Sequence, residues 1–196
     1  MSALRSLFTR ARLVGLALAV FVAALDQLVK WFVTGVMAVN SAGDQKELLP
    51  FFDLTYTRNY GISLGMLEAT SLEMRWGLVL VTGLIAGIVL IWMMREERFG
   101  DIAGLALILG GAIGNIYDRF RFGYVIDYAD LHIGDFRPFL IFNVADAAIT
   151  IGVVLILARA LFFGEKDEDK EHNASGPAPE PARTTGSDGA DPALEN

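Results

Sequence analysis

The stretch WGLVLVTGLIAGIVLIWMM, Trp76–Met94, contains no charged residue. It reaches the roughly 20 residues that an α-helix needs to cross the apolar core of a bilayer. Its apolar side chains surround the helix instead of forming one face, as they would on a helix that covers a soluble core. The stretch therefore predicts a membrane-spanning helix.

Three further apolar stretches predict three more spans. They run over about Leu13–Val36, Ile102–Tyr117 and Pro138–Ala158. The stretch Ile102–Tyr117 is short for a span, so we expect its ends to lie at the membrane interface. Hydrophobic residues make up 54% of the chain, which exceeds the roughly 45–50% that is usual in soluble domains.

The first apolar stretch also has features of a secretory signal peptide. Arg5, Arg10 and Arg12 precede it, and a basic start followed by an apolar run is typical of such a signal. The stretch continues past Asp26 and Lys30, however, and three more spans follow. We therefore interpret it as a span that is not removed.

Two segments are predicted to lie outside the bilayer, on the same side of it. Gly35–Arg75 contains FFDLTYTR, Phe51–Arg58, whose alternating aromatic and β-branched residues favour a strand. Phe122–Arg137 is interpreted as a loop between the third and fourth spans. The predicted fold is an all-α membrane protein with four transmembrane helices and a small extracytoplasmic β-rich surface segment between spans one and two.

The C-terminal end differs from the rest of the chain. Residues 165–196 contain nine acidic and three basic residues, so they carry most of the net charge of −7. They show no apolar periodicity and are rich in Pro, Ala and Gly, a composition that cannot bury enough surface to fold. We expect a transmembrane domain over residues 1–164 and a disordered acidic tail over 165–196.

Composition excludes several classes of function. The chain has no cysteine, and His132 and His172 are its two histidines. Thiol nucleophiles, a Ser-His pair and a histidine metal cluster are therefore not expected. No basic patch with interleaved aromatic residues indicates nucleic-acid binding. We expect no cofactor and no metal.

Charges inside apolar spans are the most informative residues. Asp146 lies in the fourth span, at a predicted depth of roughly 12 Å if the helix begins at Pro138. Asn143 precedes it by three residues and shares its helix face. An ionisable group at this depth costs about 2.5–3.5 kcal/mol and usually has a function. The alternative is an aspartate that merely pairs with an arginine of another helix.

A second polar group ends the third span. Asn115 lies one turn before Asp118 and Arg119, so all three can point into the bundle, although the last two are expected where the span meets water. An interfacial anchor with a snorkelling arginine is the simpler interpretation of that pair. The nearby Gly110, Gly111 and Gly114 form a small-residue face that favours close helix packing.

Asp127 follows in the predicted loop. If the loop folds back along the membrane surface, Asp127 can meet Asp146, although an isolated loop aspartate is usually just solvated. Two neighbouring carboxyl groups cannot easily both ionise, so they share one proton. The ionised group can then activate water while the protonated group polarises a peptide carbonyl. Such a pair cuts peptide bonds without a thiol or a serine base.

Five blocks of sequence resemble those of the lipoprotein signal peptidases, also called signal peptidase II. They are DQLVK at Asp26–Lys30, NYGISLG at Asn59–Gly65, GGAIGNIYDRF at Gly110–Phe120, VIDY at Val125–Tyr128 and FNVADAAITIG at Phe142–Gly152. The resemblance covers about Leu13–Phe163, and the order and spacing of the blocks are specific. It departs at Leu64, where the family commonly has an aromatic residue.

The resemblance implies an aspartic endopeptidase in which Asp127 and Asp146 are the catalytic pair. The polar residues that line and support the site would be Asn115, Asp118, Arg119 and Asn143. Two more, Asn59 and Gly61, would lie in the surface segment that closes over the substrate. At the outer end of the first span, Asp26 and Lys30 would have structural or substrate-positioning roles.

The resemblance also implies partners and a location. The substrate would be a bacterial prolipoprotein whose cysteine already carries a diacylglyceryl group, cleaved just before that cysteine. We expect a monomer among the lipids of the bacterial inner membrane, with the active site near the extracytoplasmic face. The N-terminal arginines favour a cytoplasmic location for both termini.

Two other functions fit the intramembrane charges. A small proton-coupled transporter or channel subunit would use them as a proton relay, but a relay has little use for Asp127 and the chain has no repeat. A non-enzymatic membrane scaffold would use the polar residues only to lock its helices together. Dependence of peptide cleavage on Asp127 and Asp146 distinguishes the protease from both.

Overall fold

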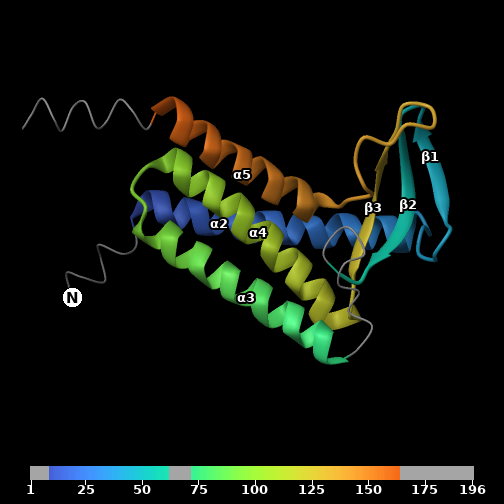
Figure 1. The fold of residues 1–196 in the computed structure, drawn as a ribbon, viewed down its shortest axis with the longest axis horizontal. Coiled ribbons are helices and arrows are strands. Elements are labelled where there is room, and N and C mark those ends of the chain that lie inside the picture. The colour runs from blue at the N-terminus through green and yellow to red at the C-terminus, as the bar shows by residue number, and fades with distance from the viewer. Residues whose placement is uncertain (1–8, 62–71, 164–196) are drawn as a thin grey trace, which may run out of the picture. The chain divides into compact units, whose positions relative to one another are not determined.

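The computed structural model describes residues 9–61 and 72–163. Four of its helices are long and apolar enough to cross a membrane, as predicted. They are α2 (Arg10–Trp31) with its π-helical extension η1 (Phe32–Val36), α3 (Leu72–Arg95), α4 (Phe99–Phe122) and α5 (Val144–Phe163) (Figure 1). The predicted disordered tail and Leu64 lie outside the described residues.

A small antiparallel sheet accompanies the helices. Its strands are β1 (Gln45–Leu49), β2 (Phe52–Asn59) and β3 (Val125–Leu131), in the order β1-β2-β3. Strand β2 lies where Phe51–Arg58 was predicted to be extended. Strand β3 follows α4, so the sheet also draws on the connection between the third and fourth spans (Figure 1).

The interpretation of Asp127 as a loop residue is therefore wrong. Asp127 lies on β3, opposite Thr57 of β2. The free edge of β2 supplies the partner that a short strand needs, and this pairing between distant segments is invisible to a local reading of the sequence. The strand fixes the position of Asp127 more firmly than a loop would.

Helix α4 packs against α2, α3 and α5, and its small residues allow the close approach that was predicted. A Cβ atom built on Gly110 would lie 2.6 Å from the carbonyl oxygen of Ala19 in α2. On another face of α4, a Cβ atom on Gly104 would lie 3.1 Å from the carbonyl oxygen of Gly152 in α5. Helix α3 instead exposes most of its apolar side chains, as expected where a helix faces lipid.

Two of the span boundaries that differ from the prediction affect the site. Helix α4 continues to Phe122 because Asp118, which was expected to meet water near the predicted end at Tyr117, is fully buried among polar partners. Helix α5 begins at Val144 instead of Pro138, so Asp146 lies in its first turn. The predicted depth of roughly 12 Å along the helix is therefore wrong.

The start of α5 is determined by a side-chain cap. Asn143 precedes the helix, and its Oδ1 accepts a hydrogen bond of 2.9 Å from the backbone N–H of Asp146. This is the geometry of an N-cap, which satisfies one of the free N–H groups at a helix start. The residues before it are not helical, and Phe142 forms an isolated bridge with Ala129 of β3. The cap thus starts α5 beside the sheet.

The sheet rests on the C-terminal end of the first span through an apolar cluster. Val33 of η1 packs there with buried residues from the following segment, β2 and β3, namely Val39, Leu54, Tyr56, Ile126, Tyr128 and Ala129. This cluster gathers the end of α2, the strand β3 and the first turn of α5 at the same end of the bundle. Asp26, Lys30, Asp127 and Asp146 lie on these elements, and Asn115, Asp118 and Arg119 lie on α4.

Candidate active site

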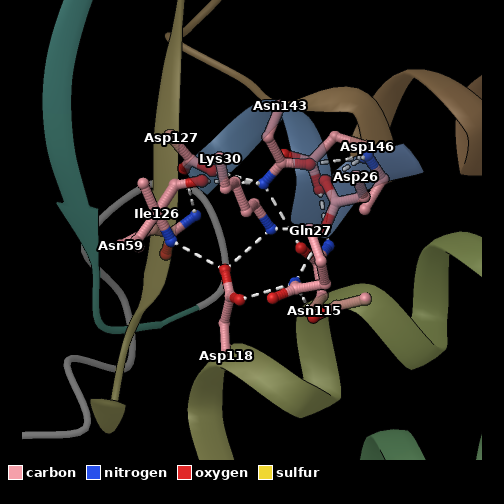
Figure 2. A network of polar contacts seen from close by, with 12 residues as sticks. Asp26, Gln27, Lys30, Asn59, Asn115, Asp118, Ile126, Asp127, Asn143 and Asp146 are labelled. Atoms are coloured by element: carbon pink, nitrogen blue, oxygen red, sulfur yellow. Dashed lines mark hydrogen bonds and ion pairs between the residues drawn. The ribbon is translucent and has the colours of Figure 1, made fainter. Parts of the chain in front are cut away.

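Asp127 is buried, with 2% of its surface exposed. Its Oδ1 accepts a hydrogen bond of 2.6 Å from Nδ2 of Asn143, and its Oδ2 accepts one of 3.0 Å from Nδ2 of Asn59. Asn59 ends β2, and its own Oδ1 accepts from the backbone N–H of Gly61 at 3.1 Å. Both carboxylate oxygens of Asp127 are therefore oriented by amide donors (Figure 2).

Asp146 is half-buried, and α4 orients its side chain. Nδ2 of Asn115 donates a hydrogen bond of 2.8 Å to Oδ1 of Asp146. Oδ1 of Asn115 in turn accepts a bond of 3.3 Å from Nδ2 of Asn143. Asn143 thus links the supports of both aspartates, because it bonds directly to the side chain of Asp127 and to the backbone of Asp146.

The two aspartates line one cavity of about 280 Å³, together with Asn59. An apolar cavity of about 310 Å³ shares Asp146, Leu140, Phe142 and Thr150 with it and is also lined by Leu131, Phe139, Ala147 and Ile151. Asp146 therefore stands at the boundary between a polar space and an apolar one. Water and an apolar group can meet at that point.

The electrostatics of the cavity favour the protonated form of Asp127. Burial, followed by the negative charge of Asp146, raises the pKa of Asp127 to about 7. The hydrogen bonds from Asn59 and Asn143 act in the opposite direction, because they stabilise the ionised carboxylate. The net effect is that Asp127 keeps its proton at higher pH than an ordinary aspartate.

A buried ion cluster lies beneath the pair. Nζ of Lys30 is 2.7 Å from Oδ2 of Asp26 and 2.7 Å from Oδ2 of Asp118 (Figure 2). The side chains of the two aspartates are 0% exposed and that of Lys30 is 3% exposed. Their polar contacts are with other residues of the protein, and none of the three residues lines either cavity.

Arg119 occupies a position between this cluster and the cavity. It is 9% exposed, and its Nη2 donates a bond of 3.4 Å to the carbonyl oxygen of Gly61. The charges of Asp146, Asp127 and Asp118 act on its guanidinium group. Arg119 was expected near water at the end of a span, but it is buried.

Comparison with known proteins adds independent information. The family model described as Signal peptidase (SPase) II matches residues 18–162. The chain belongs to the signal peptidase II family. It is therefore a membrane aspartic peptidase and a multi-pass bacterial membrane protein, and the alternatives of a transporter, a channel subunit and a scaffold are not supported.

Relatives in the signal peptidase II family extend over nearly all of the membrane domain. The lipoprotein signal peptidase of Sphingopyxis alaskensis is 57% identical over 166 residues, which are 85% of this chain and 94% of the relative. That of Rhizorhabdus wittichii is 51% identical over 154 residues, or 79% and 89%. A solved bacterial membrane enzyme at 1.9 Å resolution matches with a TM-score of 0.65 and 30% identity, covering 76% and 94%.

One polar residue of this signal peptidase II chain was missed in the sequence. Nε2 of Gln27 lies 3.1 Å from Oδ2 of Asp26 and 2.8 Å from Oδ1 of Asp118, so it joins the buried ion cluster. The signal was present, since a polar amide within an apolar span usually has a polar partner.

Proposed function

We propose that this chain removes signal peptides from lipid-modified bacterial prolipoproteins, with Asp127 and Asp146 as its catalytic aspartates. The substrate is a precursor whose cysteine carries a diacylglyceryl group, and the scissile bond directly precedes that cysteine. The observation that carries the proposal is that both carboxyl groups line one cavity and both residues hydrogen-bond to Asn143.

The pair divides the work of hydrolysis between its two protonation states. The ionised carboxylate takes a proton from water as the water oxygen bonds to the peptide carbonyl carbon. The protonated carboxyl donates a hydrogen bond to the carbonyl oxygen and so stabilises the charge that develops there. The proton taken from water then passes to the leaving nitrogen as the peptide bond breaks. A pKa of about 7 for Asp127 supports a singly protonated pair near neutral pH.

The surrounding polar residues orient the pair. Asn59, Asn115 and Asn143 donate hydrogen bonds to the carboxylates. Arg119 adds a buried positive charge, and its bond to Gly61 connects that charge to the segment next to Asn59. These contacts support roles in catalysis and in closure over the substrate.

The apolar cavity beside Asp146 suits the lipid part of the substrate or an apolar side chain of the signal peptide. It shares Leu140, Phe142 and Thr150 with the cavity of the aspartates. A bound precursor can therefore place apolar groups in one cavity and its scissile bond in the other. A helical signal must unwind locally first, because helical backbone groups are already paired.

We place both termini in the cytoplasm and the active site near the extracytoplasmic face of the inner membrane, in a monomer. The basic residues before α2 support this orientation. The sheet lies at the C-terminal end of the first span, which is the end opposite to these basic residues (Figure 1). The catalytic domain comprises residues 1–164, and residues 165–196 form a separate acidic tail.

The test is cleavage of a synthetic diacylglyceryl-cysteine precursor by purified protein. Asp127→Asn and Asp146→Asn are expected to keep the thermal stability of a folded protein and to lose cleavage by about 10²–10⁴-fold or more. In cells, lipid-modified precursor accumulates uncleaved. Asp101→Asn, a matched change in the first turn of α4, is the control and keeps its activity. Near-normal cleavage by either site variant contradicts the assignment.

A further inference from the structure

Each proposed catalytic aspartate is preceded by a residue whose backbone N–H donates a hydrogen bond to a buried carboxylate. Oδ2 of Asp118 accepts a hydrogen bond of 3.1 Å from the N–H of Ile126, the residue before Asp127. Oδ1 of Asp26 accepts one of 3.0 Å from the N–H of Ala145, the residue before Asp146. The supports come from different helices, and the supported segments come from a strand and from another helix.

Two further side chains, those of Lys30 and Gln27, join the carboxylates of Asp118 and Asp26 to each other. Nζ of Lys30 lies 2.7 Å from a carboxylate oxygen of Asp26 and 2.7 Å from one of Asp118. Nε2 of Gln27 bridges the same pair at 3.1 and 2.8 Å. Figure 2 shows Lys30 and Gln27 between the elements that carry the two catalytic aspartates.

Burial makes this arrangement rigid. Asp26 and Asp118 are 0% exposed and Lys30 is 2% exposed, so water cannot replace a lost contact. Removal of one partner from a buried ion pair leaves an uncompensated charge and forces its neighbours to rearrange. Gly114 adds a steric limit, since a Cβ atom there would lie 2.7 Å from Oδ2 of Asp26.

We propose that Lys30 and Gln27 are positioning residues that set the separation of the two catalytic carboxyl groups by holding Asp26 and Asp118 together. The proposal rests on the assignment of Asp127 and Asp146 as the catalytic pair. It gives Lys30 and Asp26 a role toward the enzyme's own aspartates instead of toward the substrate. Neither Lys30 nor Gln27 lines the two cavities near the pair, so neither is placed to contact substrate.

The consequence is a specific kinetic signature. A catalytic group displaced by about 1 Å loses about 10²-fold in rate, while substrate binding by other surfaces is retained. Replacing Lys30 or Gln27 with Met keeps the length of each side chain but removes its donors. We expect kcat to fall by about 10–100-fold and KM to change by less than about twofold.

A matched control separates positioning from general stability. Asp101 of α4 pairs with Arg159 of α5 at 2.8 Å, about 25 Å along α4 from Asp118 at 1.5 Å per residue. Asp101→Asn therefore weakens the helix bundle without touching the contacts of Lys30 and Gln27 with Asp26 and Asp118. For all three variants, the melting temperature in detergent and the kinetics on the synthetic diacylglyceryl-cysteine precursor are measured together, at a temperature where each is folded.

The expected result is a loss of kcat in Gln27→Met and Lys30→Met, with normal kcat in Asp101→Asn even where its melting temperature falls as far. If Lys30→Met does not fold, Gln27→Met decides the question alone, because it removes no charge. Unchanged kcat in Gln27→Met, or an equal loss in Asp101→Asn, overturns the proposal. A change in KM with normal kcat also overturns it, since that result indicates substrate contact.

Parallel assays of Asp127→Asn and Asp146→Asn keep this proposal distinct from the one on which it rests. If these variants are inactive while Gln27→Met is normal, the catalytic pair stands and the positioning role fails. If they remain active, the catalytic assignment itself fails.

Discussion

The side-chain amide of Asn143 lies 2.6 Å from a carboxylate oxygen of Asp127. Its other end, Oδ1, caps α5 by accepting from the N–H of Asp146. One residue therefore starts the helix that carries Asp146 and orients the aspartate that faces it from the sheet. Asn143 thus has two roles, capping α5 and orienting Asp127, and different substitutions can separate them.

Asn143→Ser and Asn143→Ala are expected to differ in stability and to agree in activity. Serine retains an oxygen that can cap the helix, whereas alanine loses the cap at a cost of about 1 kcal/mol. Neither side chain reaches Asp127, so both variants lose the donor that orients it, and we expect kcat to fall by about 10²-fold in each. Thermal melting and cleavage kinetics provide the comparison, and retained activity in the serine variant would show that the bond to Asp127 is dispensable.

The rate of cleavage is expected to fall as the pH rises through about 7. Burial and the charge of Asp146 raise the pKa of Asp127 to about 7, so above that value Asp127 loses its proton and the proposed catalytic pair loses its acid. Replacement of Asn59 by Leu removes a bond that stabilises the ionised form of Asp127. The pKa then rises further, and the alkaline limb of the kcat/KM profile moves upward by about one pH unit.

The direction of this shift is the informative part. A downward shift in Asn59→Leu, or an alkaline limb that ignores the substitution, would mean that the limb reports a group other than the pair. Asn40→Leu serves as the control. The side chain of Asn40 donates to the backbone carbonyl of Thr34, and Asn40 is not hydrogen-bonded to Asp127 or Asp146. Its pH profile should match that of the original protein.

Gly110→Ala is expected to destabilise the protein, while Gly87→Ala leaves it unchanged or slightly more stable. A Cβ atom on Gly110 would lie 2.6 Å from the carbonyl oxygen of Ala19, so α2 and α4 must separate. A Cβ atom on Gly87 of α3 has no neighbour within 4 Å among the described residues. Alanine there gains about 0.5–1 kcal/mol of helix propensity. Melting temperatures in one detergent compare the two variants, and equal values would show that the helices separate without cost.

Deletion of residues 164–196 is expected to leave cleavage within about twofold of the full chain. The family match ends at residue 162, and every residue assigned to the site precedes it. The assay is cleavage of the synthetic precursor by truncated and full-length protein. A large loss in kcat would mean that the tail takes part in the reaction.

Much of the site was predictable because the membrane makes polar residues conspicuous. Asp146 and Asp118 stand out in apolar stretches, where an unpaired charge is costly, and Asn115 stands out as a polar amide one turn before Asp118. Their burial and mutual contacts follow from that cost. Gln27 carries no charge and was overlooked, although the same reasoning applies to its amide.

Other features were not accessible to local reasoning. Strand β3 forms because β2, from a segment before the second span, offers it an edge. The end of α4 was misplaced since a charged residue usually ends a span, whereas Asp118 finds Lys30 and Gln27 as partners inside the protein. The start of α5 depends on the cap at Asn143, which a local reading took as an interior residue.

The sequence by itself determined the four apolar helices and the polar residues among them, because hydrophobicity and the cost of burying charge are properties of each segment alone. Only the tertiary structure decided that Asp127 lies on a strand and that Asp118 and Asp26 hold the backbone before each aspartate. Those contacts join residues far apart in the chain, so they exist only once helices and sheet have packed together.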